Sequence, residues 1–367
     1  MSIVKGSFAF RMMYVPQDLP ADVLERFTKD SAPTLDKVGV DACVGWVGRR
    51  HALDLPISEE NSALAGYTTL ILRKAERKVP AARLKAECAM VEQQKMQAEG
   101  VPFLNKKTRK EIREQVLTHL LPTMEPSLSG VEFVYDGRNR VLFTTATSDK
   151  QLDSFTVNWL KATGVDIAPV IPATAAISRK KINVRDWKGT SFTPEVGDES
   201  MENAPGEDFL TWLWYKVETG GGLFKDDDNG DFAVQLEGPL LMERKGEGAH
   251  ETSLRKGLPT ISDEAKSALL AGKKLVRAKI SIAWLDMVWS FGFDATNFIF
   301  RGMRLPEIKE KLDVASVFQK RVLDISQVCN FMLTLFDQFV TVRNDVDAWK
   351  KLQEEIHSWA SAKTGKK

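Results

Sequence analysis

Lysine and arginine residues gather in one stretch of the sequence, where they could neutralise phosphate groups. Residues 73–113 contain twelve of them against five glutamates, a net charge of +7. The run Lys106-Lys-Thr-Arg-Lys110 lies at or just before the expected start of a helix, where the helix dipole disfavours each cation by ~0.3 to 1 kcal/mol. Helix stability therefore does not explain this run. Phosphate binding would explain the run, although a solvated face partly balanced by Glu111 and Glu114 is the simpler interpretation.

Other charged segments are interpreted more simply. Two smaller basic clusters are typical of solvated faces: Arg179, Lys180 and Lys181 with Arg185 and Lys188, and Lys273 and Lys274 with Arg277 and Lys279. Residues 195–231 hold eleven acidic against two basic residues, a net charge of −9. The whole chain, with 51 basic and 50 acidic residues, carries a net charge of +1. Composition alone therefore predicts no partner.

Arrangements that could hold a metal are incomplete. None of the four histidines stands at metal-ligand spacing from a cysteine or another histidine. The run Lys225-Asp-Asp-Asp-Asn-Gly230 resembles a calcium loop, but it places Leu236 where the bidentate glutamate is required. Glycine-rich phosphate loops and the nucleophile elbow of hydrolases do not occur. We expect no cofactor and no metal.

One set of residues keeps a nuclease open as an alternative. Asp294, Glu307 and Lys309 have the spacing of a metal-dependent nuclease, in which two carboxylates hold Mg²⁺ while a lysine polarises the water. The proline before Glu307 and the helix expected there argue against it. We therefore expect no enzymatic activity. A third class is a protein-interaction scaffold whose partner docks on the acidic stretch.

The cysteines and the apolar runs predict a cytoplasmic location. Cys43, Cys88 and Cys329 are odd in number and far apart, which fits a reducing compartment. The N-terminus lacks an uncharged apolar region, and no run reaches the ~18 apolar residues of a membrane span.

The elements expected to carry the basic stretch are a strand and two helices. Tyr67 to Leu72 predicts a buried strand. A helix begins at Pro80 and ends at Gly100, and a second begins with the capping box Thr108-Arg-Lys-Glu111 and ends at Pro122. Together they form a helical hairpin, residues 80–121, with a basic loop at its tip.

The remaining pattern predicts an α+β fold with antiparallel sheets and a helical C-terminus. Strands are expected at 7–15, 131–135, 141–145, 165–172, 234–242, 274–284 and 287–299, and helices at 21–29, 150–162, 262–270 and from 309 onward. The predicted domains are 1–190, a strand-rich 191–308 with an acidic loop segment, and a helical 309–367, with the first boundary within 190–206. Phe209 to Tyr215 is expected in the core. The heptad seam from Phe318 to Phe339 is interpreted as internal packing or, if exposed, as a dimer contact.

Several short segments, taken in order, resemble the bacterial recombination-associated proteins of the RdgC family. They are Gly45-Trp-Val47, Leu70 to Pro80, Lys106-Lys107, Val116 to Pro122, Ala146 to Lys150 and Ala168 to Pro172. Phe209 to Tyr215 and Leu254 to Pro259 look like the longer branch of that family.

The resemblance implies a horseshoe-shaped monomer that pairs at both ends into a ring around duplex DNA. It also implies DNA binding without sequence preference, to duplex and to single-stranded DNA, and antagonism of the RecA recombinase in the nucleoid. The basic hairpin becomes the favoured contact, within a candidate set of Arg73, Lys74, Arg77, Lys78, Lys106, Lys107, Arg109, Lys110, Arg113, Arg179, Lys180 and Lys181. Where the family commonly has a basic and an aromatic residue, this chain has Thr123-Met-Glu-Pro126, and Glu125 would repel phosphate.

Overall fold

The computed structural model describes residues 3, 6–193, 203–244 and 251–362 as an α+β fold. One antiparallel sheet of 13 strands joins the two halves, in the order β10-β9-β11-β12-β13-β1-β6-β5-β4-β2, with β3, β7 and β8 paired at its sides. The strands are β1 (Phe8–Tyr14), β2 (Cys43–Val47), β3 (Ala63–Leu64), β4 (Tyr67–Arg77), β5 (Pro126–Asp136), β6 (Val141–Thr144), β7 (Ala168–Pro169), β8 (Leu223–Asp226), β9 (Gly230–Glu243), β10 (Glu251–Leu254), β11 (Lys274–Trp284), β12 (Met287–Asp294) and β13 (Ile299–Arg304).

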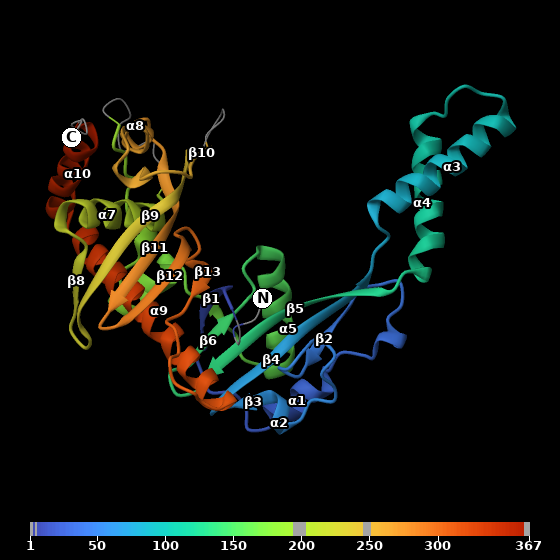
Figure 1. Ribbon diagram of the computed structural model, residues 1–367, viewed down its shortest axis with the longest axis horizontal. Coiled ribbons are helices and arrows are strands. Elements are labelled where there is room, and N and C mark those ends of the chain that lie inside the picture. Colours follow the sequence, from blue (N-terminus) through green and yellow to red (C-terminus); the bar gives the residue numbers. More distant parts are fainter. Residues whose placement is uncertain (1–2, 4–5, 194–202, 245–250, 363–367) are drawn as a thin grey trace.

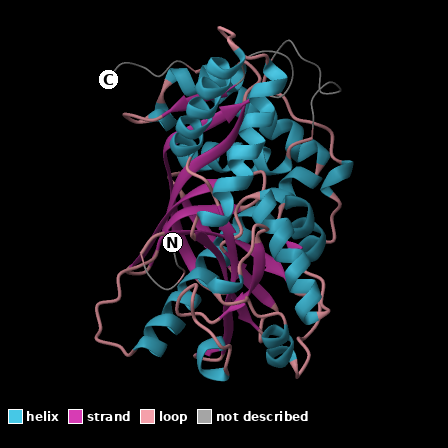
Figure 2. Cartoon of the chain, turned by 90° about the vertical axis from the view of Figure 1, so that its right-hand side faces the viewer, coloured by secondary structure: helices cyan, strands magenta, loops and turns pink. Residues whose placement is uncertain are grey.

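The helices cover the sheet and extend one end of the molecule. They are α1 (Val23–Lys29), α2 (Glu59–Ser62), α3 (Ala81–Glu99), α4 (Lys106–Leu120), α5 (Asp149–Thr163), α6 (Pro172–Lys180), α7 (Pro205–Gly220), α8 (Asp263–Leu270), α9 (Val314–Asn344) and α10 (Val346–Ser361). Figure 1 shows an open horseshoe, with the C-terminal lobe as one arm and the α3–α4 hairpin as the other. Figure 2 shows the strands as one layer along the height of the molecule, with most helices to one side. The predicted α+β class is confirmed.

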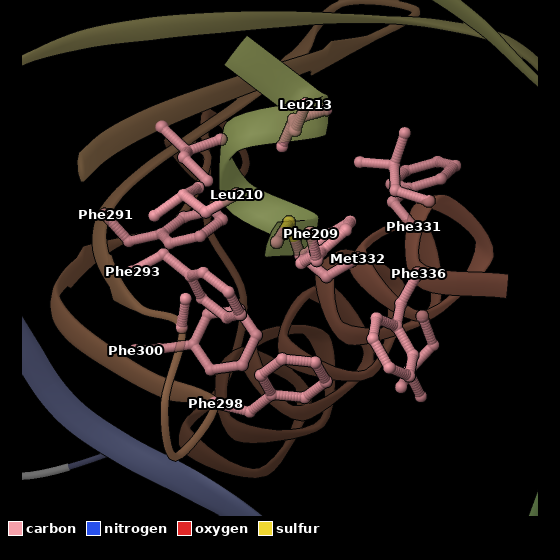
Figure 3. Close-up of a cluster of buried hydrophobic side chains, with 14 of the residues drawn as sticks. Phe209, Leu210, Leu213, Phe291, Phe293, Phe298, Phe300, Phe331, Met332 and Phe336 are labelled. Carbon is pink, nitrogen blue, oxygen red and sulfur yellow. The ribbon is translucent and has the colours of Figure 1, made fainter. Parts of the chain in front are cut away.

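The C-terminal lobe is held by an aromatic core between the sheet and α7 and α9. The α9 seam from Phe318 to Phe339 is buried throughout, and Phe336 packs edge-on against Phe209 of α7 with ring centroids 5.3 Å apart. Figure 3 shows these rings meeting Phe293 and Phe298 of the sheet side. The seam is therefore internal packing, and it leaves no apolar face for a dimer contact.

The N-terminal half has its own aromatic core beneath α1 and α5. Trp46 of β2 and Phe133 of β5 lie with ring centroids 5.6 Å apart, and Phe133 and Trp159 of α5 with centroids 5.2 Å apart. All three side chains are buried. Edge-to-face rings of this kind add to the burial of their large apolar area. This core fixes β4 and β5, which carry the hairpin.

Four expectations for secondary structure were wrong in part. The helix expected from residue 309 onward begins only at Val314, where the side chain of Asp313 caps it by accepting from Ala315 N and Ser316 N. The expected strand at 165–172 is only the two-residue β7, because Pro172 starts α6 and supplies the fixed φ of a first helical position. The expected strand at 287–299 ends at Asp294, as β12; a turn in which Phe298 has a φ of +49° follows, and β13 beyond it was not predicted. The acidic segment expected as loop contains the 16-residue helix α7.

The division of the chain at 190–206 stays a prediction. Residues 194–202 of that range lie outside the described residues. In the ranges that are described, no helix has both the length and the apolar character needed to cross a membrane.

Candidate nucleic-acid interface

A long two-stranded ribbon carries the helical hairpin away from the core. β4 and β5 pair from Thr68 and Tyr135 to Arg77 and Pro126, well beyond the end of β6. Leu84 of α3 packs with Ile112 and Val116 of α4 in a small core of their own. Figure 1 shows the hairpin standing apart from the C-terminal lobe. The predicted helical hairpin is confirmed, but the basic loop expected at its tip is wrong, because residues 100–105 contain no lysine or arginine and Lys106 and Lys107 belong to α4.

Helix α4 begins three residues earlier than its sequence predicts, at Lys106. Asn105, not Thr108, is the cap, because its side chain accepts a hydrogen bond from Thr108 N at 2.8 Å. The capping box expected at Thr108 was therefore wrong. Lys106 and Lys107 now occupy the first turn, where cations face the positive end of the helix dipole. That placement lowers the stability of the helix. The presence of these lysines is therefore better explained by an interaction outside the helix.

The cations of α4 are exposed, and several have no ion pair. Lys106, Lys107 and Arg113 are exposed and form no salt bridge with any residue that the structure describes. Lys106, Lys110 and Arg113 recur at steps of four and three, so they share one face of α4. Lys110 and Arg109 make only loose pairs, both 3.7 Å long, with Glu114 and Glu92. Exposed pairs of this kind contribute little and exchange readily for phosphate.

An exposed aromatic residue at the hairpin tip was missed from the sequence. Phe103 lies in the loop between α3 and α4, and 71% of it is exposed. Its neighbour Leu104 is buried in the hairpin core, which fixes the loop. A lone phenylalanine between Pro102 and a buried leucine is typical of a core residue, so the sequence held no signal for its exposure.

Arg73 does not belong to an exposed basic surface. It is 1% exposed, and its guanidinium donates to Ala52 O at 3.2 Å and to Pro33 O. Along β4, odd-numbered side chains face the two loops that contain these carbonyls, one before and one after β2. Arg73 therefore holds both loops on the sheet, and its place among the expected DNA contacts is corrected.

Arg77 ties the base of the hairpin to the core. Its guanidinium donates to Val38 O at 3.0 Å, to Gly39 O at 3.2 Å, to Pro122 O at 3.3 Å and to Met124 O. Those carbonyls belong to two separate loops. Arg77 is thus a structural clamp at the point where the ribbon meets α4, in the segment that departs from the family pattern.

Lys74 and Lys78 share one carboxylate on the other face of β4. Glu76 accepts from Lys74 Nζ at 2.5 Å and also pairs with Lys78. These two contacts lower the pKa of Glu76 to about 2. The trio keeps a net charge of +1, and Lys78 is 67% exposed. The pair of lysines can still attract an anion.

The second and third basic clusters differ in how far acidic residues neutralise them. Arg179 pairs with Asp337 at 2.7 Å, while Lys180 and Lys181 remain exposed at the end of α6. The third cluster is largely neutralised, as Lys274 meets the buried Asp208 at 2.9 Å and Lys279 meets Glu237 at 2.5 Å.

The acidic stretch is largely turned inward. Asp208 pairs with Lys274, Glu218 pairs with Lys266 at 2.8 Å, and Asp226 accepts from Thr334 at 2.6 Å. Asp226 also caps its own turn, as expected for an acidic turn. Within the described part of this stretch, the exposed carboxylates are Asp227, Asp228 and Asp231. Of its described carboxylates, Asp208 and Glu218 thus pair with lysines of the same lobe.

The candidate nuclease residues do not come together. Asp294 accepts from Arg277 at 2.9 Å and from Arg301 at 3.2 Å. In the register of β12 and β13, Arg304 lies opposite Ser290, which is four residues, or ~13 Å, from Asp294 along β12. Glu307 follows Arg304, so it lies beyond the end of the strand pair that is distant from Asp294. Across the described residues, no group of three or more His, Cys, Asp or Glu side chains could hold a metal ion.

Fold and site together define an α+β protein that presents a basic helical hairpin on a β-ribbon. The family model described as "Putative exonuclease, RdgC" matches residues 42–187, which include β2, both helices of the hairpin and α6. The match covers less than half of the chain, and over residues 42–187 it supports the resemblance to the RdgC family that was drawn from the sequence. No curated protein matches the chain. The family match supports a recombination-associated role.

Proposed function

We propose that the chain binds double-stranded DNA without sequence preference, as a ring-shaped dimer that limits access of the RecA recombinase to DNA. Single-stranded DNA is a second ligand, and the site of action is the cytoplasmic nucleoid. Lysine and arginine side chains neutralise phosphates and release counterions, which supplies affinity without reading bases. No chemical step on the DNA is part of this proposal.

The exposed cations of the helical hairpin are the main support for DNA binding. Lys106, Lys107 and Arg113 form no salt bridge with a described residue, and two of them occupy a helix turn that disfavours cations. Lys110, Lys78, Lys180 and Lys181 are further exposed contacts. Arg73 and Arg77 act in the scaffold, and Arg179 is partly neutralised by Asp337.

Basic residues of the C-terminal lobe add to the proposed DNA-binding surface. Arg277 and Arg301 share the single carboxylate of Asp294, so this trio has a net charge of +1. The core side of these strands is covered by α7 and α9, and Figure 1 shows those helices on the far side of the strands from the hairpin. The polar face is therefore turned toward the open side of the horseshoe, where a duplex would pass.

The salt dependence of binding tests the hairpin. Reversing Lys106, Lys107 and Lys110 to Glu should weaken every duplex about equally and leave the fold intact, because these side chains lie outside the apolar face of α4. For each phosphate that is no longer neutralised, the slope of log affinity against log salt should fall by ~0.9. Reversal of Lys85, an exposed lysine of α3, is the control. Wild-type affinity in the triple variant, or affinity independent of salt, would refute the proposal.

The family description makes nuclease activity the alternative to test. Incubation of the protein with end-labelled DNA and Mg²⁺ separates the two functions. We expect intact DNA. Degradation that is abolished by Asp294→Asn would assign an enzyme, and degradation that survives this variant would place its site elsewhere.

A further inference from the structure

Where β5 runs out toward the hairpin, its outer edge pairs with no strand in the described part of the chain. β6 pairs with β5 from Phe133 to Asp136, and Thr145 N then donates to Glu132 O at 2.9 Å. Beyond that contact, residues 127–130 are all exposed. Figure 1 shows β5 continuing past β6 toward the hairpin, along the open side of the horseshoe.

The backbone groups at this edge can be assigned from the register. Alternate residues of an antiparallel strand turn their N–H and C=O to the same edge. Glu132 uses this edge for Thr145, so Gly130 and Leu128 direct their N–H and C=O the same way. Among the described residues, no hydrogen bond reaches these groups of Leu128 or Gly130. Two donors and two acceptors therefore alternate along an open edge.

This edge lacks the features that usually prevent strand addition. Natural sheets protect open edges with charged side chains, prolines, bulges or a covering segment. Pro126 stands at the start of β5, but Ser127-Leu-Ser-Gly-Val131 contains no charge. Leu128 is 37% exposed. The edge is thus chemically open to an extended chain.

A groove of about 270 Å³ adjoins the same segment. Val44, Leu72 and Val131 give it apolar walls. Its polar lining consists of Lys74, Glu76, Ser129, Lys150, Gln151 and Ser154. Lys150, in the first turn of α5, makes no ion pair with a described residue, whereas Glu76 is already engaged by two lysines. The groove therefore suits an apolar side chain next to an acidic one.

We propose that the β5 edge binds an extended segment of a partner protein, which adds a strand to the sheet and places apolar and acidic side chains in the groove. Strand addition satisfies donors and acceptors together, and the groove provides side-chain preference. A phosphate would gain the two N–H groups but would face the two carbonyl oxygens. The observations therefore favour a peptide over DNA. The site goes beyond the proposed function, because it needs neither DNA nor a dimer.

Two fluorescent octapeptides test the site, one alternating valine with glutamate and the other valine with lysine. We expect the glutamate peptide to bind the full chain and to slow amide exchange at Leu128 and Gly130. Leu128→Pro removes one edge N–H and should weaken binding at least tenfold, since proline is tolerated at a sheet edge. Leu128→Ala keeps that N–H and should bind within threefold of wild type. Lys150→Glu should shift the preference toward the lysine peptide.

The outcomes separate the possible occupants. No protection of these amides by the peptide, or equal binding by the proline and alanine variants with both folded by circular dichroism, would overturn the proposal. Protection that rises with protein concentration alone would assign the edge to a second copy. Protection by a duplex that is absent in Leu128→Pro would assign it to DNA. Each of the last two results would also overturn the peptide assignment.

Discussion

Lys107 and Arg73 lie in the same basic stretch, yet the structure gives them opposite roles. Lys107 is exposed in the first turn of α4, while Arg73 is buried under the loops that contain Pro33 and Ala52. The difference arises from strand alternation, since β4 turns odd-numbered side chains toward these loops and even-numbered ones away from them. Charge counting along the sequence cannot distinguish the two.

Replacing Arg73 should affect stability and not DNA binding specifically. Arg73→Ala leaves the carbonyls of Ala52 and Pro33 without their donor, so we expect the free energy of unfolding to fall by about 2 to 4 kcal/mol. Lys85→Ala, at an exposed site, should change it by less than about 0.5 kcal/mol. Urea denaturation measures both. An unchanged free energy of unfolding in Arg73→Ala would show that the loops at Pro33 and Ala52 do not depend on this guanidinium.

Glu76 should make the chain sensitive to acid. Lys74 and Lys78 lower its pKa to about 2, below its ordinary value of 4.5. A carboxylate with a lowered pKa contributes stability that is present above pH 4.5 and is lost as the pH falls toward 2. Because the lysines are partly exposed, we expect about 1 kcal/mol. Glu76→Gln should remove this part of the pH dependence of unfolding; an unchanged profile would contradict the pairing.

At the scale of elements, the hairpin depends on one clamp. Arg77 connects the loop at Val38 with the loop at Pro122, at the junction of ribbon and hairpin. We expect Arg77→Ala to speed amide exchange in α3 and α4 and to weaken duplex binding, with exchange in α9 unchanged. Lys78→Ala, one residue away, is the control for removal of a positive charge. Equal exchange in both variants would show that the hairpin is held without Arg77.

Sequence patterning predicted the elements better than their ends. The alternating pattern predicted β11 with its observed bounds, and the helical hairpin followed from Pro80 and Gly100. The start of α4 was misplaced because Asn105 and Thr108 are both good caps, and the sequence does not show which of them caps the helix, whereas in the structure Asn105 accepts from Thr108 N. The pairing of Lys274 with Asp208 joins residues far apart in sequence, so no local pattern could reveal it.

At the scale of the whole molecule, the horseshoe sets the expected assembly. One arm is the C-terminal lobe and the other is the hairpin, and a single chain leaves the side between them open. Closure around a duplex therefore needs a second copy. A dimer with two contacts can be stable even if each interface is modest in size. Once the first contact has formed, the second forms within the same dimer and not between separate molecules. The seam of α9 from Phe318 to Phe339 is buried within the chain, so we expect these contacts to involve other side chains.

Dissociation from DNA of defined ends tests the ring most directly. A fluorescent duplex is compared with the same duplex blocked at both ends by bulky protein, and release is followed after addition of competitor DNA. Sedimentation under the same conditions should give a dimer at micromolar protein. We predict a clearly longer lifetime on the blocked duplex, because a closed ring leaves a linear duplex by sliding off its ends. Equal lifetimes, or a monomer by sedimentation, would contradict the ring and leave a basic surface that touches DNA from one side.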